Sequence, residues 1–126
     1  RNQRILDLTR TEVQDYIIET MTNVFSSAEI SYVKWDMNRT FTDYYSGALP
    51  PERQGEVAHR YVLGLYRCMR ELTARFPDIL FEGCSAGGNR FDLGILSYFP
   101  QIWASDDTDA LCRAEIQTGY SYGYPL

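Results

Sequence analysis

The stretch YVKWDMNR, residues 32–39, decides how this chain folds. Residues 30–35 form an apolar, β-prone run that predicts a strand. The run ends abruptly in a lysine, an aspartate and an asparagine. Lys34 and Asp36 are two residues apart, so on a strand their side chains point to the same face of the sheet. Polar groups at the end of a buried strand are costly without partners, and this strand end is therefore a candidate functional site.

Helix and strand patterns alternate on both sides of this stretch. Thr11 and Gln14 form a capping-box pattern that predicts the start of a helix. Apolar residues at helical spacing predict helices that cover residues 11–28, 52–75, 91–98 and 109–118, the last one ending at Gly119. Short apolar runs predict two more strands, at residues 79–82 and 101–104.

The alternating order of these elements predicts an α/β fold made of parallel β/α units. Three strands cannot close a barrel, and a free-standing sheet of three would leave open edges. We therefore interpret the chain as a consecutive slice of a larger (β/α)8 TIM barrel. A small doubly wound domain is the alternative.

Each of the three predicted strands ends in a polar cluster. The first cluster holds Lys34, Asp36 and Asn38, the second holds Glu82 and Cys84, and the third is SDDTD at residues 105–109. The carboxyl ends of the strands lie on one face of an α/β barrel, where barrel enzymes keep their reactive groups. Three polar strand ends in a row predict one site on one face.

Composition excludes several classes of function. The 126 residues are 44% hydrophobic and 14% aromatic, which suits a globular protein. The net charge is −5 and no basic run is present, so we expect no nucleic-acid partner. No apolar run approaches the roughly 18 residues of a membrane span, so we expect no membrane partner either.

Cysteine and histidine usage narrows the chemistry. The three cysteines stand at positions 68, 84 and 112 without a C-x-x-C pair. This spacing disfavours a disulfide framework and a zinc site, and it favours a reducing compartment such as the cytoplasm. His59 is the only histidine, which disfavours Ser-His-Asp catalysis and excludes a multi-histidine metal site. Acid/base chemistry in this segment must therefore use carboxylates.

Asp36 and Asp106 are the candidate reagents. Two carboxylates about 5–5.5 Å apart perform retaining glycoside hydrolysis, one as the nucleophile and the other as the acid/base. Lys34 would keep Asp36 ionised. Burial beside Trp103 would favour the protonated form of Asp106, which the acid/base needs before attack.

Simpler interpretations of the same residues stay open at this point. Thr108 or Asp109 is expected to cap the helix that follows. Asp36 on its own is as readily a turn residue at a strand end. Paired aspartates also bind Mg²⁺ in phosphatase-like sites, and Cys84 on its own is more often a buried structural thiol than a reagent.

Longer motifs carry a specific resemblance. They are KWDMNR at 34–39, EGCSAGGNRFD at 82–92 and WASDDTDA at 103–110, with RNQ at 1–3 and IQTGYS at 116–121. Over its whole length the chain resembles glycoside hydrolase family 36, the α-galactosidase family related to melibiases and raffinose-acting enzymes. Ala86 is a minor departure, because many members carry another glycine there.

The resemblance implies roles for the matching residues. Asp36, after the fourth barrel strand, corresponds to the nucleophile, and Asp106, after the sixth, corresponds to the general acid/base. Cys84 is expected near the 2-hydroxyl of galactose, and Gly87 is expected to approach the sugar through its backbone. The full set of expected sugar-binding or pocket-lining residues is Lys34, Cys84, Gly87, Arg1, Asn38 and Trp103.

The resemblance also implies a reaction and a larger protein. The chain is expected to be the central slice of the catalytic barrel, roughly strands 4 to 6 with their helices. The enzyme would be a retaining α-galactosidase that acts on melibiose, raffinose and related oligosaccharides without a metal or other cofactor. Family members also have an N-terminal β-sandwich, a C-terminal β domain and an upstream double-aspartate motif, and none of these lies in the 126 residues. The isolated chain is therefore expected to be inactive, and the whole protein is expected to form homo-oligomers such as tetramers.

Three other functions fit the same scaffold. A galactosyltransferase and an α-N-acetylgalactosaminidase would use the same pair of aspartates. Cys84 argues against the N-acetyl substrate, because a 2-acetamido group needs room there. A non-catalytic sugar-binding relative is disfavoured because both Asp36 and Asp106 are present.

Overall fold

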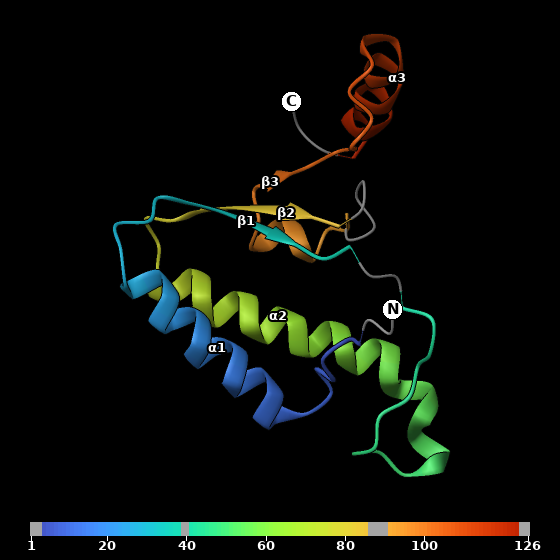
Figure 1. Cartoon of the computed structure of the whole chain (residues 1–126). Helices are drawn as coiled ribbons and strands as arrows, with labels where there is room; N and C mark the ends of the chain where they lie inside the picture. The colour runs from blue at the N-terminus through green and yellow to red at the C-terminus, as the bar shows by residue number, and fades with distance from the viewer. Residues whose placement is uncertain (1–3, 39–40, 86–90, 124–126) are drawn as a thin grey trace. The chain divides into compact units, whose positions relative to one another are not determined.

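A computed structural model describes residues 4–38, 41–85 and 91–123 (Figure 1). The elements in chain order are α1 (Thr11–Ser26), β1 (Tyr32–Asp36), η1 (Pro51–Glu56), α2 (Val57–Arg75), β2 (Leu80–Cys84), η2 (Ile95–Ser97), β3 (Gln101–Ile102) and α3 (Ala110–Ser121), where η marks a 3-10 helix. The chain divides into two units. One unit joins Arg1–Tyr32 to Arg39–Leu80 and holds α1 and α2, and the other joins Val33–Asn38 to Phe81–Leu126 and holds the strands and α3.

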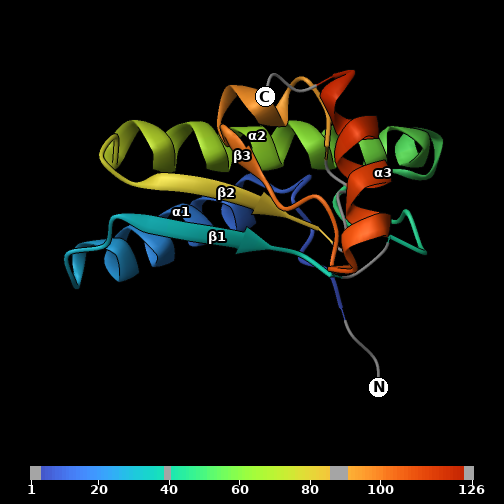
Figure 2. The same ribbon diagram turned by 90° about the horizontal axis from the view of Figure 1, so that it is seen from above.

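The strands form one small sheet in the order β1-β2-β3. β2 and β3 pair in parallel, with Glu82 opposite Gln101 and Gly83 opposite Ile102. Figure 2 shows the arrows of β1 and β2 running in the same direction. Parallel strands separated by helices confirm the predicted α/β class.

Buried aromatic side chains pack together in the sheet-bearing unit, close to its strands. Phe81 on β2 and Phe99 before β3 stack with their ring centroids 5.7 Å apart, and both side chains are buried. Ile95 in η2 is buried as well. A Cβ added at Gly83 would lie 2.9 Å from Cδ1 of Ile102, so the Ile102 side chain packs directly over this glycine. This packing fixes where the residues after each strand can lie.

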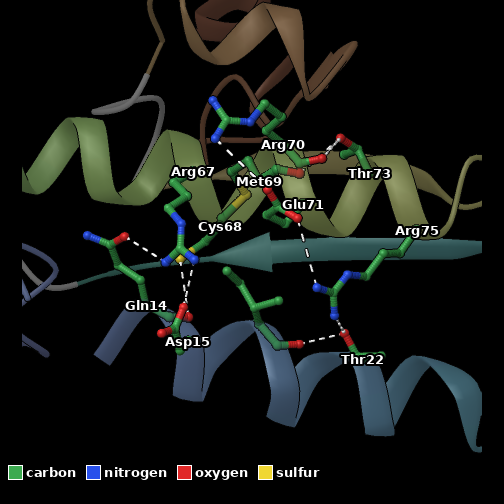
Figure 3. Close-up of polar contacts among 11 residues, drawn as sticks. Gln14, Asp15, Thr22, Arg67, Cys68, Met69, Arg70, Glu71, Thr73 and Arg75 are labelled. Atoms are coloured by element: carbon green, nitrogen blue, oxygen red, sulfur yellow. Dashed lines mark hydrogen bonds and ion pairs between the residues drawn. The ribbon is translucent and has the colours of Figure 1, made fainter. Parts of the chain in front are cut away.

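Two paired helices make the other unit. Arg67 on α2 donates to Gln14 Oε1 at 3.0 Å and to Asp15 Oδ1 at 2.7 Å on α1 (Figure 3). Further along, Arg75 donates to Thr22 Oγ1 at 3.0 Å. The facing stripes bury apolar side chains, namely Ile18 and Phe25 on α1 and Leu65, Met69 and Leu72 on α2. The amphipathic pattern seen in the sequence is therefore used for helix–helix packing.

The capping box predicted for the first helix is wrong. The N-cap is Arg10, which makes no side-chain capping bond, and Thr11 already lies inside the helix. Gln14 is buried, and its Nε2 donates to the Leu8 carbonyl oxygen at 2.8 Å. The Gln14 side chain is therefore bonded to Leu8 and does not serve a capping box.

The predicted end of the last helix is also wrong, since α3 continues through Gly119 to Ser121. Tyr120 holds the extra turn in place, because its hydroxyl donates to the Ala104 carbonyl oxygen at 3.2 Å and its ring packs on Phe91. The start of this helix is as predicted. Asp109 is its N-cap and accepts from the backbone N–H groups of the second and third helical residues.

All three cysteines are free thiols. Cys68 and Cys84 are buried, whereas Cys112 is exposed. Burial raises the pKa of Cys68 to about 11, so this thiol is unreactive at neutral pH. Within the described ranges, no helix has the length and apolar character needed to cross a membrane.

Gly64 is the position where a single methyl group should cost the most. A Cβ added there would collide with the Leu8 carbonyl oxygen and lie 2.8 Å from Gln14 Nε2. We expect Gly64→Ala to lower the free energy of unfolding of the α1/α2 unit by about 1–3 kcal/mol, because the backbone of residue 8 cannot yield without losing its bond to Gln14. Thermal unfolding of the full-length protein measures the loss.

Gly119→Ala is the matched control, since it lies in helix α3 and no atom lies within 4 Å of its added Cβ. It should be neutral or stabilising by up to about 1 kcal/mol, because alanine is the better helix former. Equal shifts in the two variants would contradict the steric argument.

Candidate active site

Asp36 is the exposed last residue of β1. Asn38 Nδ2 donates to Asp36 Oδ2 at 2.9 Å. Partial burial raises the pKa of Asp36, but hydrogen bonds from Asn38 and Cys84 lower it, and so does the charge of Lys34. The net pKa lies below the ordinary value for aspartate. The carboxylate is therefore ionised at neutral pH, the form that a nucleophile requires.

Cys84 is influenced electrostatically by both predicted reagents. The residue ends β2 and is buried. Burial raises the pKa of the Cys84 thiol, and Asp36, which accepts its hydrogen bond, raises it further. The charge of Asp106 raises it as well, whereas Lys34 lowers it. Asp36 is the last residue of β1 and Asp106 lies beyond β3. Carboxylates from two strand ends therefore both raise the pKa of this thiol.

Asp106 is held by the ring of Trp103. The indole Nε1–H of Trp103 donates to Asp106 Oδ1 at 2.7 Å. Asp106 itself is exposed, so the prediction that this carboxylate is buried beside Trp103 is wrong. The contact with Trp103 is present, but its effect is to orient the carboxylate.

Short-range bonds shape the loop that carries Asp106. The Asp107 N–H donates to Ser105 Oγ at 3.1 Å, and the Asp109 N–H donates to Asp107 Oδ1 at 3.0 Å. Arg113 on α3 donates to the Ser105 carbonyl oxygen at 2.9 Å, and its guanidinium carbon lies 5.3 Å from the centre of the Trp103 ring. Nothing in the strand-end motifs predicted this contribution from α3.

Lys34 lies among three partners in the same unit. Its Nζ is 4.4 Å from the centre of the Trp103 ring, a cation–π contact. The same atom is 3.9 Å from Glu82 Oε1. Asp36, two residues along β1, also feels its charge. The Lys34 side chain is about two-fifths exposed.

The predicted site residues thus divide into two groups. Lys34, Asp36, Asn38, Cys84, Trp103 and Asp106 come together in the sheet-bearing unit. Arg1 and Gly87 lie outside the described residues. Across residues 4–38, 41–85 and 91–123, no three His, Cys, Asp or Glu side chains are grouped to hold a metal ion.

A hollow of about 540 Å³ opens next to the loop that carries Asp106. Its lining is largely apolar and comes from Phe91, Ala104, Ser105, Glu115, Ile116, Gly119 and Tyr120. Neither Asp36 nor Asp106 lines it, so the hollow is separate from the carboxylate pair.

Carboxylates follow the first and third strands of this parallel α/β sheet, and such an arrangement defines a class of protein with a carboxylate-based site at the carboxyl edge of its sheet. The family model for Melibiase matches residues 1–126. This chain belongs to the Melibiase family, which confirms the resemblance found in the motifs.

Alpha-galactosidase AgaA of Geobacillus stearothermophilus is 64% identical over 126 residues. The match covers 100% of this chain and 17% of that relative. A crystal structure of a substituted GH36 α-galactosidase AgaA in complex with raffinose superposes with a TM-score of 0.95 at 59% identity, covering 100% of this chain and 18% of that one. A second substituted form, in complex with stachyose, superposes with a TM-score of 0.94 at 59% identity and the same coverage. The chain therefore spans about a sixth of the relatives it matches.

Proposed function

We propose that the protein containing this chain is a retaining α-galactosidase that removes terminal α-galactosyl units from oligosaccharides such as melibiose and raffinose. The observation that carries the proposal is the contact geometry at the strand ends: Lys34, two residues before Asp36, lies 4.4 Å from the Trp103 ring, and the indole N–H of Trp103 donates to Asp106 Oδ1 at 2.7 Å. Two carboxylates at one site are the groups that retaining glycoside hydrolysis needs. The relatives named as α-galactosidases, and the complexes of one of them with raffinose and stachyose, support the substrate class.

The proposed reaction has two displacements. Asp36 attacks C1 of the terminal α-galactosyl unit, while Asp106 gives its proton to the departing glycosidic oxygen. The product of this step is a β-galactosyl ester of Asp36. Asp106, now a carboxylate, takes a proton from water, which attacks C1 and releases α-galactose and the free Asp36 carboxylate. Two inversions at C1 give net retention.

The spacing of the two aspartates supports this assignment. The raffinose complex carries an aspartate-to-asparagine replacement, and the stachyose complex carries an aspartate-to-alanine replacement. The two replaced positions are 70 residues apart in that relative. Asp36 and Asp106 have the same separation, 106 minus 36.

Other residues receive roles under the same proposal. Lys34 contacts sugar hydroxyls, Cys84 lies near the 2-hydroxyl, and Asn38 orients the nucleophile through its bond to Oδ2. Trp103 orients the acid/base and lines the pocket. Gly87 and Arg1 are assigned as sugar contacts from the family motifs.

We further propose that the chain is the part of a (β/α)8 barrel that contains strands 4 to 6. The strand order leaves β1 and β3 as sheet edges, which neighbouring barrel strands would pair. Large apolar side chains are also left exposed, with Leu93 and Leu111 each at 81% and Tyr122 at 88%. The rest of the barrel, the flanking β domains and an oligomeric assembly belong to the whole protein in this proposal. Three free thiols favour the cytoplasm as its compartment.

Stereochemistry tests the proposal directly. Full-length protein incubated with raffinose in deuterated water should release α-galactose first, and proton NMR should show the β-anomer appearing only later by mutarotation. The isolated 126-residue chain in the same assay should release none, because the barrel is incomplete. First release of β-galactose would show an inverting enzyme and contradict the double displacement. No release of galactose from any α-galactoside would contradict the activity itself.

A further inference from the structure

Glu82 is a buried carboxylate for which the proposed reaction has no role. It lies on β2 with 5% of its surface exposed. Gln101 Nε2 donates to Glu82 Oε2 at 2.9 Å, and Lys34 Nζ lies 3.9 Å from Glu82 Oε1. Burying a carboxylate is costly unless a charge or hydrogen bonds compensate it. Gln101 and Lys34 provide this compensation for Glu82.

Strand alternation explains the geometry. Lys34 and Asp36 project from one face of β1, and Glu82 and Cys84 project from one face of β2. The contacts join these pairs rung by rung, Lys34 with Glu82 and Asp36 with Cys84. On the same rung as Glu82, Gln101 stands opposite it on the next strand, β3.

The ammonium of Lys34 therefore pairs with one carboxylate and acts electrostatically on a second. Lys34 forms its ion pair with Glu82, while its charge also acts on Asp36. The Trp103 ring bounds a third side of the ammonium at 4.4 Å. A direct, close ion pair between Lys34 and Asp36 would stabilise the carboxylate and so weaken it as a nucleophile.

We propose that Glu82 is a positioning residue, which holds the ammonium of Lys34 away from Asp36 and against Trp103, where it can meet a substrate hydroxyl. This inference rests on the proposed function, because it gives Asp36 the nucleophile's role. Glu82 itself touches neither the reacting atoms nor the sugar in this scheme.

Several charged groups face this position in the sheet-bearing unit. Besides Glu82, the acidic groups are Asp36 on β1 and Asp106 beyond β3, and the thiol of Cys84 lies with them on β2. Arg113 approaches the Trp103 ring from α3. Without the charge of Glu82, the Lys34 ammonium keeps its electrostatic interaction with Asp36 and should shift toward that carboxylate. The lost negative charge and the approaching positive charge would both lower the pKa of Asp36.

The test is Glu82→Gln in the full-length protein with 4-nitrophenyl α-galactoside as substrate. We expect kcat/KM to fall about 10- to 100-fold, because the lysine moves out of its productive place. We also expect the acid limb of the kcat/KM profile to move to lower pH by about half a unit, since that limb reports the nucleophile of the free enzyme. A loss of stability alone would not move the limb. Glu115→Gln on α3 is the control for removing a carboxylate charge and should leave both readouts unchanged.

A double-mutant cycle with Lys34→Met isolates the proposed route. If Glu82 acts through Lys34, Glu82→Gln should have little further effect on kcat/KM in the Lys34→Met background. Glu82→Asp keeps the charge and should keep the acid limb at its original pH. If Glu82→Gln does not yield folded protein, the same cycle is run with Glu82→Asp. The loss in kcat/KM that Glu82→Asp causes should then vanish in the Lys34→Met background.

Two outcomes overturn the inference. One is a loss in kcat/KM that is equal with and without Lys34, and the other is an unchanged rate and pH profile in Glu82→Gln. Asp36→Ala separates this failure from a failure of the proposed function. An inactive Asp36→Ala protein beside a fully active Glu82→Gln protein rejects the positioning role alone, whereas an active Asp36→Ala protein rejects the nucleophile on which it rests.

Discussion

Replacing Asp36 by alanine in the full-length protein is expected to lower kcat on 4-nitrophenyl α-galactoside by at least about 10⁴-fold, as for other residues that form the covalent bond. The physical reason is the position of the carboxylate at the end of β1, ionised and oriented by Asn38. Alanine leaves room for a small anion but has no atom that can form the ester. Initial rates measured at saturating substrate give the loss.

Azide provides the second readout for this variant. The anion should occupy the space of the missing carboxylate and attack C1 from the same side, giving β-galactosyl azide with inverted configuration. Asp78→Ala, which removes an exposed aspartate between α2 and β2, is the control and should keep near-normal activity. An Asp36→Ala protein with a rate close to the original would show that Asp36 is not the nucleophile.

Replacing Asp106 by asparagine is expected to produce a loss that depends on the leaving group. With raffinose or melibiose, kcat/KM should fall by about 10²–10⁴-fold, because the glycosidic oxygen departs without a proton. With 4-nitrophenyl α-galactoside the loss in kcat/KM should be much smaller, since 4-nitrophenolate leaves unaided. The geometric basis is the 2.7 Å bond from Trp103, which orients the carboxylate and which asparagine can still accept.

The stereochemistry of azide rescue should be opposite in this variant. Azide should attack the galactosyl ester of Asp36 and give α-galactosyl azide, with retained configuration. Asp107→Asn is the neighbouring control, and it should keep most of the activity on both substrates because its Oδ1 can still accept from the Asp109 N–H. Equal losses of Asp106→Asn on raffinose and on the 4-nitrophenyl substrate would argue against an acid/base role.

Local patterns in the sequence predicted the main helices and strands in their order, and the family. The helix predicted over residues 91–98 is wrong, since the structure has only a 3-10 helix at Ile95–Ser97 there. Alternating helical and strand periodicity predicted the α/β class, and the motifs around Asp36, Cys84 and Asp106 identified the candidate reagents. Strand alternation alone placed Lys34 and Asp36 on one face. These features are predictable because they depend on residues close together in the chain.

Only the tertiary structure decided which side chains meet. The β2–β3 register places Gln101 beside Glu82, and the position of β1 next to β2 in the sheet brings Lys34 to the same carboxylate. Gln14 serves the packing of α1 and α2 in place of a cap. In each case the partner lies far away in the sequence or is chosen by competing contacts, so no local pattern encodes it. The sequence by itself determined the candidate reagents, and strand register and packing decided what surrounds them.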